Sequence, residues 1–151
     1  ITGESKGKPP MKVGAPVTDI TAGILAATGV LAALVSRATT GVGQRVDTSL
    51  YEAGIVHTYW QSAIASATGV APGPLGSAHP LSAPYQAFKT KDKWITVGAS
   101  NQNTWLMLLK AINRQDLQEN EMFSSNLSRK KNINQLVDIL SIELIKKTAD
   151  E

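Results

Sequence analysis

PVTDITAGILAATGVLAALVSR, residues Pro16–Arg37, is the stretch that decides the fold. Its apolar side chains recur near the 3.6-residue period of an α-helix, at Ile20, Ile24, Ala27, Leu31, Leu34 and Val35. The positions between them are mostly Ala and Gly, which let neighbouring backbones come close. A carboxylate, Asp19, stands where the helix begins. The stretch therefore predicts a buried helix of about 28 Å with an acid at its positive end.

The segments around this helix predict an α/β layer. Ile1–Ala15 is a loop because Gly and Pro interrupt it repeatedly. Gly41–Gly43 is a turn and not a dinucleotide fingerprint, since such a fingerprint follows a strand and opens a helix, whereas here a helix precedes the glycines. Gln44–Ser49 then predicts a short strand. The order helix, strand, helix favours an α/β arrangement.

A second helix is expected over Leu50–Thr68, where Ser49 and Glu52 have the spacing of a capping box. Beyond it, Gly69–Pro84 holds four prolines and three glycines, so it cannot continue a helix or form a central strand. Loops of this length are typically functional or interdomain. We therefore expect a large-domain part over residues 1–70 and a linker over 71–84.

Residues 85–151 predict a small α+β module. Tyr85–Thr90 and Trp94–Ala99 indicate a hairpin, and Ser100 or Asn101 is expected to cap the helix that follows. A last amphipathic helix is marked by Ile133, Leu136, Val137, Leu140 and Leu144. The aromatic side chains expected to fill the core of this module are Tyr85, Phe88, Trp94 and Trp105.

The composition narrows the classes of function. The net charge of +3 is scattered, and no basic run interleaves with aromatic residues, so a nucleic-acid surface is not predicted. The chain has no cysteine and only two histidines, His57 and His79, which disfavours a metal site. Ile20–Val35 is shorter than the roughly 20 apolar residues of a membrane span. Since the chain starts with Ile and ends within a helical pattern, we expect it to be part of a longer protein.

Three residues are candidates for chemistry. Asp19 has two interpretations: a plain helix cap, or a carboxylate held in one geometry that attacks an activated acyl group. His57 is expected to be a packed or surface residue. His79, which lies among small residues in the Gly/Pro-rich loop, is either a loop residue without function or part of a pocket lining. No G-x-S-x-G motif supports a serine triad.

Three blocks together resemble the class III CoA-transferases, the CaiB/BaiF family. They are PVTDITAG (Pro16–Gly23), TGVGQRVDTSLYEA (Thr40–Ala53) and GSAHPLSAPYQAFKTKDKWITVGASNQ (Gly76–Gln102). The resemblance implies an α/β fold with a Rossmann-like large domain, a small α+β domain and an interlocked homodimer. It also implies transfer of CoA from an acyl-CoA donor to a carboxylic acid. Coenzyme A is then a substrate, and no permanently bound cofactor or metal is implied.

The same resemblance assigns roles to residues. Asp19 matches the catalytic aspartate, which passes through a mixed anhydride and an aspartyl-CoA thioester. Gly76, Ser77, Ala78 and His79 correspond to the active-site loop, which in some members is a run of glycines. This sequence departs from that run, and His79 becomes a candidate for substrate contact. The residues that grip CoA would lie before Ile1, so the isolated chain is not expected to be a competent enzyme.

Two rivals stay open at this point. A 2-methylacyl-CoA racemase of the same fold would use the aspartate for proton transfer, but the run Asp19–Gly23 departs from the pattern of that branch. A non-catalytic scaffold subunit would keep the fold without activity. For the transferase we expect a cytoplasmic location, or the mitochondrial matrix in a eukaryote, and no nucleic-acid or membrane partner. The block HPLSAPYQAFKTKD (His79–Asp92) resembles the members that use dicarboxylic acids, which makes succinyl-CoA and a dicarboxylic acid one candidate pair of substrates.

Overall fold

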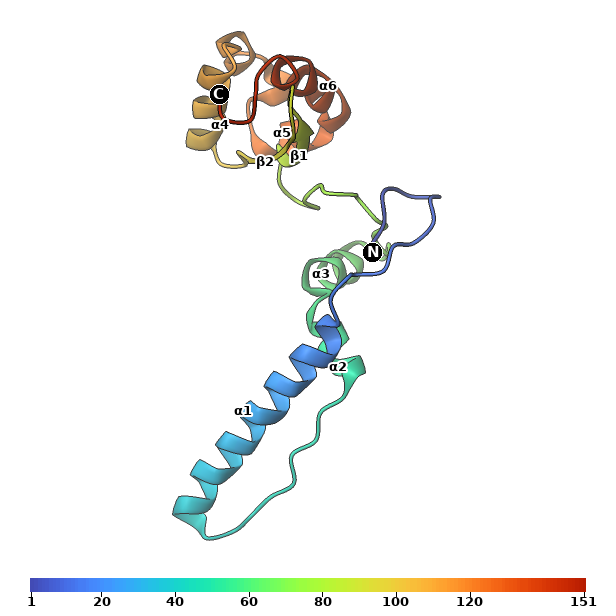
Figure 1. Ribbon diagram of the computed structural model, residues 1–151, viewed down its shortest axis with the longest axis vertical. Coiled ribbons are helices and arrows are strands. Elements are labelled where there is room, and N and C mark those ends of the chain that lie inside the picture. The colour runs from blue at the N-terminus through green and yellow to red at the C-terminus, as the bar shows by residue number, and fades with distance from the viewer. The chain divides into compact units, whose positions relative to one another are not determined.

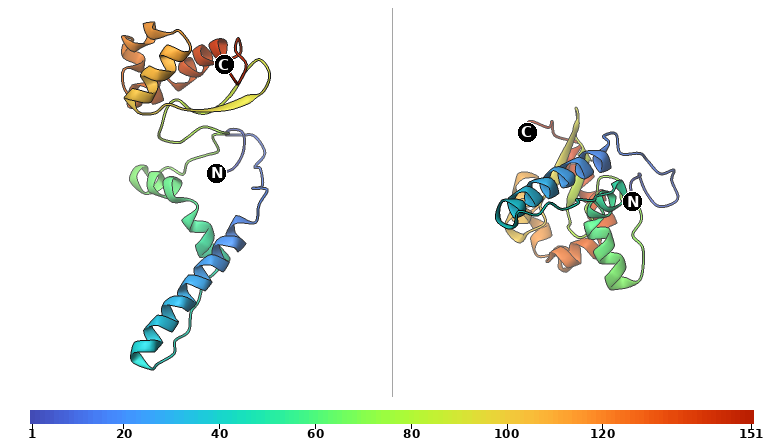
Figure 2. Two further views of the ribbon diagram at one scale, coloured as in Figure 1. Left: turned by 60° about the vertical axis from the view of Figure 1, so that its left-hand side comes forward. Right: turned by 90° about the horizontal axis from the view of Figure 1, so that it is seen from below.

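The computed structural model describes residues 1–151, which divide into two compact units. Unit 1 is Ile1–Pro74 and unit 2 is Leu75–Glu151. Figures 1 and 2 show that unit 1 is helical and that the single hairpin of the chain lies in unit 2. Whether the units are the domains of a longer protein stays a prediction.

Unit 1 is organised around one long helix, α1 (Val17–Thr40), followed by α2 (Leu50–Val56) and α3 (Tyr59–Thr68). Helix α1 ends at Gly41, whose left-handed φ of 74° suits a residue without a Cβ and whose N–H donates to the Arg37 carbonyl. Helix α2 packs against α1, and Ala53 is fully buried. Figure 1 shows the segment 41–49 running back alongside α1.

The small residues of α1 permit a close approach, as predicted. A Cβ on Gly29 would lie 2.6 Å from Cγ1 of Val46, which is closer than real Cβ contacts, so a larger residue at this position would force Val46 to shift. The prediction of a buried helix is wrong for the chain as it stands. Ala22 is the one buried residue of α1, because α2 and the segment 41–49 cover only a small part of it.

Helix α1 is also longer than the apolar stretch read from the sequence. It has 24 residues and a mean hydropathy of 1.7 over an 18-residue window, so by length and composition it could cross a membrane. The expectation that the stretch is too short for a span is therefore wrong as a statement about length. A single helix of this kind is weak evidence for a membrane span, because core helices of soluble proteins meet the same criterion.

Two other expectations for unit 1 are corrected. Residues 44–49 form no strand, because within residues 1–151 the only ladder joins β1 to β2 and the only isolated bridge joins Gly3 to Pro10. The helix expected over Leu50–Thr68 is broken after Val56, where the His57 N–H bonds back to the Gly54 carbonyl. The Ser49 half of the predicted capping box is confirmed, since Ser49 Oγ accepts from the Glu52 N–H at 3.1 Å, whereas the Glu52 carboxylate accepts from Ser49 Oγ at 3.0 Å and not from a backbone N–H.

Unit 2 contains the predicted hairpin of β1 (Tyr85–Lys89) and β2 (Trp94–Gly98), antiparallel with Phe88 opposite Ile95. Its helical elements are α4 (Gln102–Ala111), the 3₁₀ turns η1 (Gln115–Gln118) and η2 (Glu121–Phe123), α5 (Asn126–Lys131) and α6 (Ile133–Leu144). The predicted cap is confirmed in that Asn101 Oδ1 accepts from the Thr104 N–H. The sequence did not indicate α5.

The core of unit 2 is one apolar cluster between the hairpin and the helices. Its buried members are Ala83, Phe88, Trp105, Leu109, Ile112, Leu117, Phe123, Leu136, Leu140 and Leu144. Phe88 and Trp105 are therefore core residues, as predicted. Trp94 is not, because 65% of its surface is exposed and Lys89 lies 5.8 Å from its ring centroid. Tyr85 is also exposed.

A fully buried cation, Arg129 of α5, ties this core to its loops. Its Nε donates to the Ala83 carbonyl at 2.9 Å, while Nη1 and Nη2 donate to the Phe123 and Ser100 carbonyls, each at 3.0 Å. The guanidinium also lies 4.9 Å from the ring centroid of Trp105. A planar fork with fixed donors suits such convergent acceptors better than an ammonium does.

We expect Arg129→Met to lower the free energy of unfolding by about 3 kcal/mol, because it leaves buried carbonyls without donors. Arg129→Lys should recover only part of this loss. Urea-induced unfolding of the full-length protein measures the change. Arg45→Met is the matched control, since the Arg45 side chain is 85% exposed and its removal should change stability by less than about 0.5 kcal/mol. Equal effects of the two Met variants would contradict the role given to Arg129.

Candidate active site

Asp19 lies in the first turn of α1, as its third residue. The N-cap position belongs to Pro16, and no side chain caps this end of the helix. Of the two interpretations of Asp19, the plain helix cap is therefore wrong, because the helix begins two residues earlier. The carboxylate is exposed and accepts a hydrogen bond from Thr18 Oγ1 at 3.2 Å.

The carboxylate opens onto a hollow of about 560 Å³ lined by Lys12–Asp19. The first backbone hydrogen bond of the helix runs from the Ile20 N–H to the Pro16 carbonyl. The N–H groups of Thr18 and Asp19 precede it and are donors without an intrahelical partner. Together with the positive end of the helix dipole, these donors favour negative charge in this hollow.

Helix α2 fixes the turn that carries Asp19. The Thr18 methyl carbon lies 3.5 Å from the place where a Cβ on Gly54 would be. Thr21 Oγ1 and His57 Nε2 are 2.7 Å apart and form a hydrogen bond. His57 is thus an exposed residue that contacts the helix of Asp19, a contact that the sequence did not predict.

The loop Gly76–His79 belongs to unit 2 and is held against β1. Ser77 Oγ accepts from the Ala87 N–H at 3.0 Å, and the His79 N–H donates to the Tyr85 carbonyl at 2.9 Å. The rings of His79 and Tyr85 stack with centroids 5.1 Å apart. Gly76 and Ser77 form a turn closed by the bond from the Ala78 N–H to the Leu75 carbonyl at 3.0 Å, and His79 follows directly after it.

The His79 ring also fixes the chain that follows it. Nδ1 accepts hydrogen bonds from the N–H groups of Leu81 and Ser82, each at 3.1 Å. An imidazole that accepts at Nδ1 is neutral and carries its proton on Nε2. Burial, and then the nearby positive charge of Lys130, lower the pKa of His79 below its usual 6.5. The neutral form is the one that the loop requires.

Asp19 belongs to unit 1 and His79 to unit 2, so each has its own local surroundings. Sequence reasoning missed Lys130, whose Nζ donates to the His79 carbonyl at 2.7 Å. It lies in α5, which the sequence did not indicate, and nothing in the sequence pattern predicted a contact with the loop. The described chain has no group of three or more His, Asp or Glu side chains placed to hold a metal ion.

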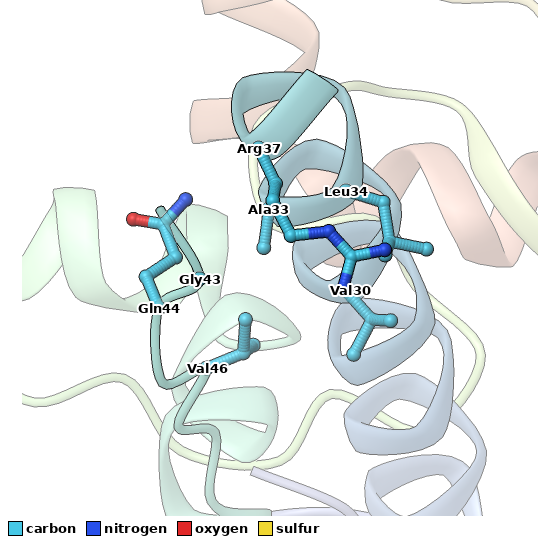
Figure 3. A pocket seen from close by; sticks show the side chains of 7 residues that line it. All are labelled: Val30, Ala33, Leu34, Arg37, Gly43, Gln44 and Val46. Carbon is cyan, nitrogen blue, oxygen red and sulfur yellow. The ribbon is translucent and has the colours of Figure 1, made fainter. Parts of the chain in front are cut away.

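A second hollow, of about 220 Å³, lies between α1 and the segment 41–49 (Figure 3). Its lining residues are Val30, Ala33, Leu34, Arg37, Gly43, Gln44 and Val46. Figure 3 shows the Arg37 side chain lying across the apolar residues of α1. Val30 is 11 residues beyond Asp19, which is roughly 16 Å along the helix. This hollow is therefore separate from the acid.

The comparisons with known proteins agree on one family. The family model described as CoA-transferase family III matches residues 1–151. An acyl-CoA transferase of Fusarium pseudograminearum is 33% identical over 156 residues, which cover 100% of this chain and 33% of that protein. The succinyl-CoA:mesaconate CoA-transferase of Haloarcula hispanica is 38% identical over 120 residues, which cover 78% of this chain and 29% of that protein.

A solved structure gives the same result for the fold. The crystal structure of a CAIB/BAIF family protein from Brucella suis matches with a TM-score of 0.76 and 29% identity, over 99% of this chain and 39% of that one. The match confirms the mixed helix and strand fold class. The chain spans about a third of the length of the curated relatives that it matches.

We expect His79 to titrate below pH 6.5 in the full-length protein. Because its pKa is lowered on folding, the unfolded chain binds this proton more tightly. The stability from the neutral ring is therefore present above about pH 6.5 and is lost as the pH falls through the folded-state pKa. Deuterium exchange at the imidazole carbon, read by mass spectrometry, measures each histidine separately. A His79 pKa at or above 6.5 would contradict the acceptor role of Nδ1.

Proposed function

The chain belongs to CoA-transferase family III, and from this premise we propose that the full-length protein transfers CoA from an acyl-CoA donor to a carboxylic acid. The family match over all 151 residues is the observation that carries the proposal. The names of the relatives support it, since each is called a transferase of acyl-CoA or CoA. The exposed carboxylate in the first turn of α1 supplies a group suited to this chemistry.

In the proposed reaction Asp19 is the nucleophile. Its carboxylate attacks the thioester carbonyl of the donor, the C–S bond breaks, and CoA leaves as a thiolate while a mixed anhydride forms. The thiolate then attacks the aspartyl carbonyl, which releases the donor acid and leaves an aspartyl-CoA thioester. The acceptor carboxylate then attacks the aspartyl-CoA thioester, which releases the CoA thiolate and forms a second mixed anhydride. The thiolate attacks the acceptor carbonyl of this anhydride, which gives the new acyl-CoA and frees the Asp19 carboxylate. Each bond that forms is matched by one that breaks, and no redox partner is needed.

Two features of unit 1 favour this role. The open N–H groups of Thr18 and Asp19 are donors next to the carboxylate, where they can stabilise negative charge that develops on an attacked carbonyl. The contacts of the first turn with Gly54 and His57 restrain the nucleophile, which lowers the entropic cost of reaching the reactive geometry.

We place the substrate contact of unit 2 at Gly76, Ser77, Ala78 and His79. The loop carries small side chains and a neutral imidazole, a combination that admits an acyl group without introducing a competing charge. For the substrates we propose succinyl-CoA and a dicarboxylic acid. Support for this choice comes from the Haloarcula relative, whose name specifies succinyl-CoA and mesaconate.

We further propose that the full-length protein is a homodimer in which the apolar face of α1 is covered. Ile24, Leu31 and Val35 are exposed in this chain, with Val35 at 72%. Burying a side chain of this size contributes about 1.5 to 3 kcal/mol, so a stable protein would cover this face. Packing inside the family fold accounts for the apolar helix without a membrane, and it fits a cytoplasmic or mitochondrial matrix enzyme.

Incubation of the full-length protein with succinyl-CoA should produce a covalent adduct on the peptide that contains Asp19, detected by mass spectrometry. Asp19→Ala removes the nucleophile, so it should abolish the adduct and lower CoA transfer by at least about 1,000-fold. Asp19→Asn tests the charge with little change in volume. Asp47→Ala is the matched control, because Asp47 is an exposed acid in the same unit and its loss should leave transfer unchanged.

Measurements of exchange and of adduct formation on the same full-length protein distinguish a transferase from a racemase and from a scaffold subunit. A racemase would exchange the α-proton of a 2-methylacyl-CoA with solvent deuterium in the absence of any acceptor acid. A scaffold subunit would give neither an adduct nor exchange with any donor. Exchange that is fast and depends on Asp19, without transfer, would overturn the transferase proposal.

A further inference from the structure

Three side chains of α5 bind the main chain between His79 and Ala83. Asn126 Oδ1 accepts from the Ala83 N–H at 2.9 Å, and Asn126 Nδ2 donates to the Leu81 carbonyl at 3.0 Å. Arg129 Nε and Lys130 Nζ donate to the Ala83 and His79 carbonyls. Their spacing of three and four residues places the three side chains on one face of the helix. We call this set of contacts the α5 clamp.

The three members differ in what else they do. Arg129 serves the core as well, since it also binds the Phe123 and Ser100 carbonyls and lies over Trp105. Asn126 follows the N-cap Ser125 and reaches the middle and end of the loop. Lys130 is the only one whose side-chain hydrogen bond goes to His79, and no carboxylate pairs with its ammonium.

The position of the Lys130 ammonium carries a desolvation cost. Its side chain is half-buried, and burial lowers its pKa below the usual 10.5. An apolar residue of similar length would avoid this desolvation cost but would leave the His79 carbonyl without this donor. The gain from Lys130 is therefore geometric, because its short 2.7 Å bond holds the carbonyl of the one imidazole in the loop.

The bond has a second effect on His79. With its carbonyl held by Lys130, its N–H bound to the Tyr85 carbonyl and its ring stacked on Tyr85, the residue is restrained at main chain and side chain alike. Nδ1 can then accept from the Leu81 and Ser82 N–H groups at the same time. Hydrogen bonds from the side chains of α5 and hydrogen bonds to the imidazole of His79 thus both restrain the main chain of residues 79–83.

We propose that Lys130 is a positioning residue, which fixes His79 and the chain 79–83 in the geometry that the proposed substrate loop requires. The proposal rests on the proposed function only for the role of the loop in CoA transfer. The structural half, that Lys130 orders this chain, stands on the contacts of unit 2. No contact of Lys130 with a reacting atom is implied.

The test compares Lys130→Met, Lys130→Arg and the control Lys131→Met in the full-length protein. Lys131 carries the same charge one residue later on an exposed side chain. Amide hydrogen exchange at Leu81, Ser82 and Ala83 reports the order of the loop. The kcat and KM for CoA transfer from succinyl-CoA to a dicarboxylic acid report the reaction.

Lys130→Met should speed exchange at Leu81 and Ser82 by about 10-fold or more, while the amides of Leu136 and Leu140 in α6 stay protected. It should lower kcat about 10-fold, since small displacements of a positioned group reduce rates steeply, with KM changed less than about 3-fold. Lys130→Arg keeps a donor and should restore most of both quantities. Lys131→Met should resemble the unaltered protein.

The proposal has two parts, the ordering of the loop and the effect on the reaction, and each can be overturned separately. Unchanged exchange at Leu81 and Ser82 overturns the ordering role, and faster exchange with unchanged kcat overturns the role in the reaction. Faster exchange at Leu136 as well would make Lys130 a general stability residue and overturn the proposal. If the unaltered protein transfers no CoA, the proposed function fails, while the exchange data still decide whether Lys130 orders the loop.

Discussion

The Arg129 guanidinium is a full positive charge at a place that water does not reach. Such a charge is stable only if its donors are used, and the carbonyls that it binds come from the loops before β1 and α4 and from the last residue of η2. All three hydrogen bonds of the guanidinium can form only while the hairpin, α4, η2 and α5 keep their positions relative to one another. This requirement explains how a unit with a two-stranded sheet has a defined loop geometry, since the sheet itself fixes only residues 85–98.

Unit 1, in contrast, has no buried charge and almost no buried core. It has one long helix with an apolar surface, two short helices and an extended segment, and its buried residues are Ala22 and Ala53. Local rules explain its form: the left-handed Gly41 ends α1, Gly29 admits Val46, and Ser49 caps α2. These devices determine direction and register, but they bury little surface. The acid in the first turn of α1 is consequently well defined locally, through Thr18 and α2, and has few contacts beyond them.

The sequence predicted the elements whose signals are local. The α1 period, the Ser49 and Asn101 caps, the hairpin at Tyr85 and the leucines of α6 are all confirmed. It failed where the outcome depends on partners distant in the chain, as with the strand at Gln44–Ser49, which lacks a neighbour, and the burial of α1. At the candidate site the motif blocks pointed to Asp19 and the loop at Gly76–His79. The contacts of His57 and Lys130 could not be predicted, because each joins residues more than 30 positions apart.

The α5 clamp binds only main-chain atoms of the loop, namely the carbonyls of His79, Leu81 and Ala83 and the Ala83 N–H. The shape of the chain 79–83 is thus independent of the side chains at Leu81 and Ser82, of which Leu81 is exposed. Mutations at these two positions would alter the chemistry that the loop presents and leave its backbone path in place. The backbone path of this loop and the side chains that it presents can therefore vary independently, because a substitution at either position does not require the loop to refold.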